Sequence, residues 1–221
     1  LTIRESNQKG IYIADSNDSA VLRCQISNTD GMGIQGRAQS GSLNNFVVDS
    51  CIVDRSDSAS NNDGCIEVTK DVGGIEIIAP SISNNIVKMH RSPTGSNVVP
   101  IELFGGIRYG RVEGNYVEGG LIGISVANTS TNCTIVGNTV YDSDGICIEV
   151  ADSQYCTIIG NTVDGNNNAG TGISIDGTSV ASSGTSVVGN TVTRNNEHGI
   201  YLVTSSPFST ISANTVLATG T

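Results

Sequence analysis

Four acidic residues, Glu67, Glu102, Glu149 and Asp176, occupy equivalent places in a short phrase that recurs along the sequence. In each phrase apolar residues alternate with polar ones, so the acidic side chains should share one outward face. Most sugar hydrolases use two carboxylates, about 5 Å apart for retention and about 6.5 to 9.5 Å apart for inversion. We therefore predict these four residues as catalytic carboxylates.

Alignment of the phrases by their apolar residues predicts one outward column of polar positions. Its members are Ala14, Gln35, Glu67, Glu102, Ser125, Glu149, Asp176 and Val203. With strands stacked about 4.8 Å apart, Glu67 and Glu102 are neighbours, and Glu102 and Glu149 lie about 10 Å apart. Stacked carboxylates repel one another, which raises a pKa or recruits a cation such as Ca²⁺. The alternative is that an acidic chain carries Glu and Asp on an outward face by default.

Basic and aromatic side chains are candidates for holding a sugar. Lys88, Arg91 and Arg108 supply positive charge, and Tyr12 and Tyr201 fall on an outward column where a ring can stack on a sugar. We predict Lys88, Arg91, Arg108 and Tyr201 as substrate-binding residues. The two histidines and six cysteines show no metal-ligand spacing, so no metal site and no cofactor beyond the calcium alternative is predicted.

The candidate residues must be positioned by short strands that belong to internal sequence repeats. Residues 133–140 (CTIVGNTV) return 23 residues later at 156–163 (CTIIGNTV), and weaker copies bring the number to about eight. Each repeat holds short strands with period-two alternation, separated by Gly and Asn turns, and none is long enough for a helix. Because one repeat cannot bury its own apolar face, successive repeats must stack as coils of a solenoid around a continuous core.

Stacking in register places like residues above one another. Asn tolerates the left-handed backbone of a bend, and stacked carboxamides can hydrogen-bond along a column. The predicted ladder consists of Asn85, Asn115, Asn138, Asn161, Asn190 and Asn214. The pairs Cys24/Cys51 and Cys133/Cys156 should likewise be neighbours; we predict reduced, stacked thiols, with a disulfide as the alternative.

On these repeats the sequence resembles the right-handed parallel β-helix (pectate-lyase-like) superfamily of pectate lyases, polygalacturonases and phage tailspikes. The resemblance implies an all-β, single-stranded right-handed parallel β-helix, and the repeats predict about eight coils over residues 1–221. Because the sequence starts without Met and stops within a repeat, we expect one domain that is a fragment of a longer chain. The resemblance also implies an extracellular or virion-associated location and, as in tailspikes, a homotrimer. Asp30, Asp63 and Asp144 each precede Gly, as in part of the polygalacturonase pattern, but Asp-Gly is a common turn dipeptide and a structural role is favoured.

Composition excludes several classes of protein. The 221-residue chain has a net charge of −10, from 21 acidic and 11 basic residues. Nucleic acid is disfavoured as a partner, because phosphate neutralisation needs clustered Lys and Arg. No apolar run reaches the roughly 18 residues that a membrane span needs.

Two functions fit the sequence. The first is a polysaccharide-active, glycan-degrading domain, either an endo-glycosidase or a lyase of the tailspike depolymerase kind. It is favoured by the resemblance, the carboxylates and the insertions 54–63 and 88–99, which should emerge as loops beside a site. The alternative is a non-enzymatic shaft or glycan-binding segment of a phage fibre or surface adhesin. In both cases the partner is a polysaccharide or cell-surface glycan.

Overall fold

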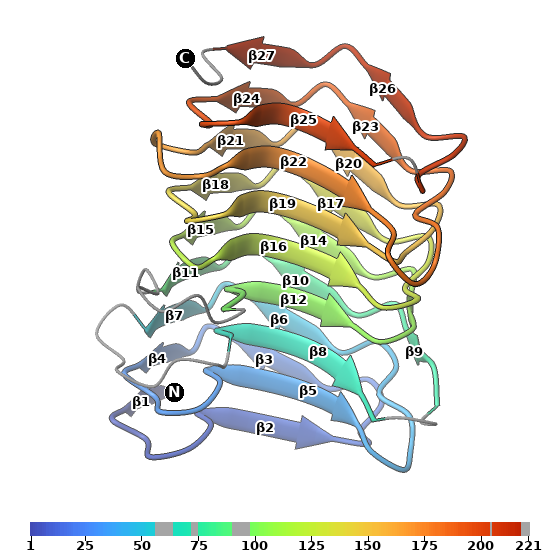
Figure 1. Cartoon of the computed structure of the whole chain (residues 1–221). Coiled ribbons are helices and arrows are strands. Elements are labelled where there is room, and N and C mark those ends of the chain that lie inside the picture. Colours follow the sequence, from blue (N-terminus) through green and yellow to red (C-terminus); the bar gives the residue numbers. More distant parts are fainter. Residues whose placement is uncertain (56–63, 72–74, 90–97, 204, 218–221) are drawn as a thin grey trace.

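The protein folds as a right-handed solenoid of parallel strands (Figure 1). The structure is a computed structural model that describes residues 1–55, 64–71, 75–89, 98–203 and 205–217. Over these ranges the chain forms 27 short strands and no helix. It follows that no described segment is a helix long and apolar enough to cross a membrane.

Each coil contributes strands to three stacked sheets, and every pairing is parallel. Sheet A contains β1 (Thr2–Arg4), β4 (Gln25–Ser27), β7 (Ile52–Arg55), β11 (Ile86–Met89), β15 (Tyr116–Glu118), β18 (Thr139–Tyr141), β21 (Thr162–Asp164), β24 (Thr191–Thr193) and β27 (Thr215–Leu217). Sheet B contains β2 (Ile11–Ala14), β5 (Ile34–Ala38), β8 (Ile66–Lys70), β12 (Ile101–Phe104), β16 (Ile122–Ala127), β19 (Ile146–Ala151), β22 (Thr171–Asp176) and β25 (His198–Leu202). Sheet C contains β3 (Ala20–Leu22), β6 (Val47–Asp49), β10 (Ser81–Ser83), β14 (Arg111–Glu113), β17 (Thr134–Val136), β20 (Thr157–Ile159), β23 (Ser186–Val188) and β26 (Thr210–Ser212). A fourth, two-stranded sheet pairs β9 (Ile77–Ile78) with β13 (Ile107–Arg108).

The register agrees with the repeats and confirms the fold predicted from the sequence. Thr134 of β17 pairs with Thr157 of β20, and Thr139 of β18 pairs with Thr162 of β21. The middle residue of each three-residue strand points inward: Val140, for example, has no exposed surface. Alternation of inward apolar and outward polar residues therefore builds one core along the whole stack.

The predicted asparagine ladder lies at the turn from sheet C to sheet A. Each side-chain Nδ2 donates to the Oδ1 of the next asparagine at 2.9 to 3.0 Å, from Asn85 through to Asn214. The left-handed conformation belongs to the preceding residue, such as Gly137 with φ 63°, and not to the asparagine itself. The asparagine is thus required by its hydrogen bonds, and the bend is made by its neighbour.

The stacked cysteines are free and buried, as predicted. Cys133 and Cys156 directly precede paired residues of β17 and β20, and the backbone N–H of Cys24 donates to Sγ of Cys51 at 3.4 Å. Burial raises the pKa of the thiol of Cys65 to about 12. Because the thiolate is the reactive form, these cysteines serve as small apolar core residues.

Candidate functional site: the outer face of sheet B

A row of polar side chains follows one register position across sheet B, and we name it the carboxylate column. Its members, in spatial order, are Tyr12, Gln35, Glu67, Glu102, Ser125, Glu149, Ser174 and Tyr201. Glu67 and Glu102 are direct neighbours, and Glu102 and Glu149 are separated by Ser125, as predicted. A tyrosine lies at each end of the row, where its ring can stack on a sugar.

Three predicted members of the column were misplaced by two residues. Asp176 pairs with Ala151, and Ser174 occupies the position next to Glu149. Ala14 pairs with Arg37, so that Tyr12 is the column member of β2, and Val203 lies beyond the end of β25. A shift of two residues keeps every apolar side chain pointing inward, so the alternation of the sequence does not detect it.

The carboxylates of the column are held by neighbours in adjacent coils. The side-chain amide of Gln35 donates from Nε2 to Oε1 of Glu67 at 2.8 Å, and the Ser125 hydroxyl donates to Oε2 of Glu149 at 3.2 Å. Gln35 and Ser125 are buried, whereas the three glutamates are partly exposed. The buried Oε1 of Gln35 has no hydrogen-bond partner in the structure. A buried amide and a buried hydroxyl thus position Glu67 and Glu149 at the surface, where a ligand can reach them.

Burial and crowding keep a proton on the central carboxylate. Desolvation, followed by the charges of Glu67 and Glu149, raises the pKa of Glu102 to about 7. Desolvation also raises the pKa of Glu149; the Ser125 hydrogen bond opposes this shift and Asp176 adds to it. Glu102 is therefore a carboxylic acid able to donate a proton near neutral pH, beside carboxylates able to accept one or to attack.

Glu102→Gln is expected to stabilise the fold at pH 8 and to leave its stability unchanged near pH 4. The folded-state pKa of Glu102, about 7, lies above the ordinary value of 4.5, so the unfolded chain loses this proton first as pH rises. The stability present below pH 4.5 is therefore lost between pH 4.5 and 7, by about 2 kcal/mol after allowance for partial exposure. Urea-unfolding midpoints of both proteins at pH 4, 6 and 8 measure this; an equal difference at every pH contradicts it.

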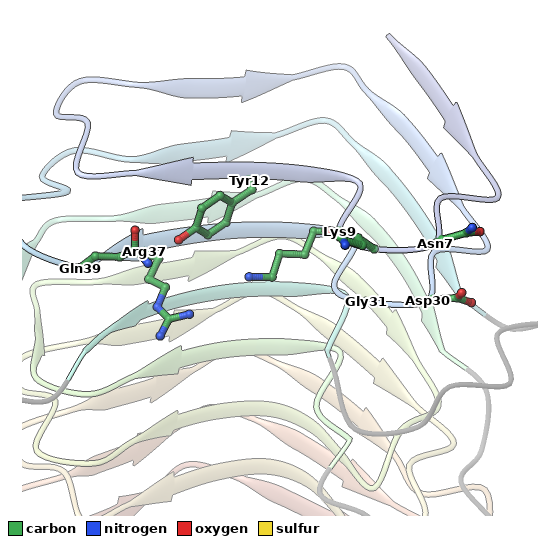
Figure 2. Close-up of a pocket in the computed structure, with 8 residues that line it drawn as sticks. Asn7, Lys9, Tyr12, Asp30, Gly31, Arg37 and Gln39 are labelled. Carbon is green, nitrogen blue, oxygen red and sulfur yellow. The ribbon is translucent and has the colours of Figure 1, made fainter.

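A pocket of about 640 Å³ opens beside the Tyr12 end of the column. Figure 2 shows Lys9 and Tyr12 from the first coil and Arg37 from the next among its lining residues. The Lys9 ammonium lies 4.3 Å from the centroid of the Tyr12 ring, and Nε of Arg37 donates to Oδ1 of Asp71 at 2.8 Å. No sequence motif marks this pocket, because its residues come together only through the pairing of neighbouring coils, such as that of β2 with β5.

The predicted substrate-binding residues do not form one group. Lys88 lies on sheet A, where it pairs with Glu118 at 3.2 Å. Arg108 lies in β13 and pairs with Glu76 at 3.1 Å. Tyr201 is the one that belongs to the column. Arg91 lies outside the described residues, as do Asp63 and most of the two insertions.

Metal ligands are not gathered anywhere in the described ranges: no three His, Cys, Asp or Glu side chains there form a set that could hold an ion. All six cysteines are buried, and His198 is exposed with its ring 4.7 Å from the ring of Tyr201. His90 lies outside the described residues. In the described ranges, the thiol and imidazole donors that a copper ion prefers therefore do not come together in a set of three.

Solved structures share this fold at low sequence identity. The periplasmic alginate epimerase AlgG matches with a TM-score of 0.68 and 14% identity, over 96% of this chain and 47% of that one. Tailspike protein 3 of bacteriophage CBA120 matches with a TM-score of 0.52 and 9% identity, over 93% and 42%. The enzymatically active domain of tailspike protein 2 of the same phage gives 0.50 and 15%, over 88% and 33%. This chain spans about half the length of the AlgG chain.

No curated protein matches this sequence. The family described as NosD, periplasmic copper-binding protein, matches residues 81–219, which is more than half of the chain. The described ranges hold no set of three thiol, imidazole or carboxylate donors, so they do not fit the copper of that description. By the extent of the match, the chain belongs to the NosD family of proteins, here in the form of a right-handed parallel β-helix.

Proposed function

We propose that this chain binds and degrades a polysaccharide on the outer face of sheet B. The observation that carries the proposal is the cluster of Glu67, Glu102 and Glu149, in which the pKa of Glu102 is raised to about 7. A raised pKa beside other carboxylates on an exposed face is typical of a catalytic acid. Tyr12 and Tyr201 bound the same row and supply faces for sugar rings.

The similar structures support this proposal by what their names state. One is an alginate epimerase, and another is the enzymatically active domain of a phage tailspike. Because identities near 15% show the fold alone, the substrate and the reaction of this chain rest on its own residues. The same likeness favours a location outside the cytoplasm and, for a tailspike-like assembly, a homotrimer, which sedimentation would measure.

The spacing of the three glutamates supports a separate role for each of them in this proposal. Glu102 donates its proton to the glycosidic oxygen as the bond breaks. Glu67, on the adjacent strand at about 5 Å, has the separation of a retaining nucleophile. Glu149, two strands away at about 10 Å, leaves room for a water molecule and is closer to the separation of an inverting base. Asp176 lies outside this row and acts on it through its charge, which helps to raise the pKa of Glu149.

The test is incubation with a panel of neutral and anionic polysaccharides, with and without Ca²⁺. Anionic chains belong in the panel because Lys9 and Arg37 place positive charge beside the column. New reducing ends without unsaturated product indicate hydrolysis, and ultraviolet absorbance of an unsaturated uronate indicates elimination. Neither signal on any polysaccharide, with retained glycan binding, overturns the proposal in favour of a non-enzymatic shaft or binding segment.

A further inference from the structure

A second row of side chains follows the edge where each coil enters sheet C, near β9 in Figure 1. The residue at this bend donates its backbone N–H to the next coil: Tyr109 to the carbonyl of Thr131 at 3.1 Å, and Tyr155 to that of Ser183 at 2.9 Å. Seven coils share this contact, and the bend of an eighth, at Phe208, has the same left-handed backbone; φ lies between 53° and 68° at all eight. The bend residues are Asp18, Asn45, Ala79, Tyr109, Asn132, Tyr155, Gly184 and Phe208.

Three of these bends carry an aromatic residue where the backbone does not favour one. Bulky residues are outliers at positive φ, whereas Asn and Gly adopt this conformation readily. The side chains of Tyr109, Tyr155 and Phe208 gain no core packing in return, since these residues are 53%, 58% and 91% exposed. Exposed aromatic rings at backbone positions that disfavour them indicate a surface that binds a ligand or a partner.

The rings recur in every second coil. Asn132 separates Tyr109 from Tyr155, and Gly184 separates Tyr155 from Phe208, so successive rings start about 10 Å apart at about 4.8 Å per coil. A Cβ atom added to Gly184 would lie 2.6 Å from Cδ1 of Tyr155. The absence of a side chain at Gly184 therefore leaves the space in which the Tyr155 ring lies along the edge.

We propose that this aromatic strip, Tyr109, Tyr155 and Phe208, binds an extended polysaccharide chain that runs along the solenoid axis. The faces of aromatic rings pack on the C–H faces of pyranose rings, and the two-coil spacing is close to the length of two sugars in an extended chain. Every second sugar then meets a ring. The residues between the rings, Asn132 and Gly184, leave no continuous apolar patch of the kind that a protein partner buries.

This strip goes beyond the proposed function, because it binds glycan without taking part in the chemistry. It lies at the edge of sheet C, whereas the carboxylate column lies on the face of sheet B. The guanidinium carbon of Arg108 is 5.4 Å from the centroid of the Tyr109 ring, which places a hydrogen-bond donor for sugar hydroxyls at one end of the strip.

Affinity electrophoresis through gels that contain hydroxyethyl cellulose, xylan or alginate tests the proposal, with coiled amylose as the reference glycan. The wild-type protein is expected to be retarded by at least one extended chain and not by amylose. Tyr155→Asn is expected to weaken that binding about fivefold or more, because one stacking face is lost. Its urea-unfolding midpoint should not fall, since Asn adopts the left-handed bend more readily than Tyr. Loss of binding is then not loss of folding.

Asn132→Ala is the matched control, at the same bend one coil away, and should leave retardation unchanged. Retardation is read without reference to cleavage, so the strip is tested separately from the carboxylate column even if no glycan is cleaved. Three results would each overturn the proposal: no retardation by any extended glycan, equal retardation of Tyr155→Asn, or dissociation of an oligomer by Tyr155→Asn, which would assign the strip to a contact between copies.

Discussion

Glu102→Gln is expected to lower the rate of glycan cleavage about a thousandfold while the protein stays folded. Gln has nearly the same shape as the protonated carboxyl but cannot transfer a proton to a leaving oxygen, and general acid catalysis contributes about 10² to 10⁴-fold to such reactions. Folding is not at risk, since removal of this ionisable group relieves the burial of a charge beside Glu67 and Glu149. Release of reducing ends from the best substrate of the panel measures the loss.

Glu113→Gln is the matched control for that experiment. Glu113 lies on sheet C, is paired with Arg111 at 2.5 Å, and has its pKa lowered mainly by that hydrogen bond. Its replacement should leave cleavage within about twofold of wild type, since the pair is exposed to solvent and lies on sheet C, not on sheet B. Equal activity of Glu102→Gln and Glu113→Gln would remove Glu102 from the mechanism.

The pH profile of cleavage by the wild-type protein tests the same assignment independently. If Glu102 is the acid, cleavage declines as pH rises through about 7, because the carboxyl loses the proton that it must donate. The same burial that raises the pKa of Glu102 also makes the folded protein less stable as pH rises from 4.5 to 7. If Glu102 is the acid, one partly buried carboxyl sets the pH dependence of both cleavage and stability.

The sequence predicted correctly those sheets in which every repeat has the same residue type at the same position. The Gly-Asn-Thr-Val phrase fixes the register of sheets A and C, so the solenoid and the asparagine ladder were correct down to the pairing of Asn138 with Asn161. Sheet B has no such fixed phrase. Its phrases share only alternation and a preceding glycine, and the last third of the chain offers two candidates, Gly170 and Gly172. Alignment on Gly172 predicts Asp176 in the column. The observed register corresponds to alignment on Gly170 and places Ser174 there.

Contacts between repeats that have no repeated residue type could not be predicted at all. Arg55 is fully buried and donates from Nε to the carbonyl of Thr29 and from Nη1 to that of Gly64, which ties neighbouring coils together. The pocket lined by Lys9 and Arg37 also could not be predicted. Both features depend on which long side chains the register brings together, and these side chains do not recur at the same position in successive repeats.

Asn138→Ala is expected to destabilise the protein by about 4 kcal/mol, because a buried ladder member has four hydrogen bonds and no access to water. Its Nδ2 donates to the carbonyl of Val112 and to Oδ1 of Asn161, both at 3.0 Å. Its Oδ1 accepts from the backbone N–H and from Nδ2 of Asn115, at 2.9 and 3.0 Å. Alanine leaves these partners buried and unpaired, and each unsatisfied group costs about 1 to 3 kcal/mol.

The loss of stability should depend on how many hydrogen bonds the replaced asparagine makes. This dependence distinguishes the loss of ladder hydrogen bonds from a general sensitivity of the bends to substitution. Asn214 is the last member; it accepts from Asn190 and donates to Val187, and it is partly exposed, so Asn214→Ala should cost about half as much. Asn132, exposed and outside the ladder, should cost less than about 1 kcal/mol when replaced by Ala. Urea unfolding followed by far-ultraviolet circular dichroism ranks the three variants. Equal losses at Asn138 and Asn132 would mean that the ladder adds nothing to the cohesion of the coils, whereas the expected order would show that these stacked amides add to the backbone hydrogen bonds that join one coil to the next.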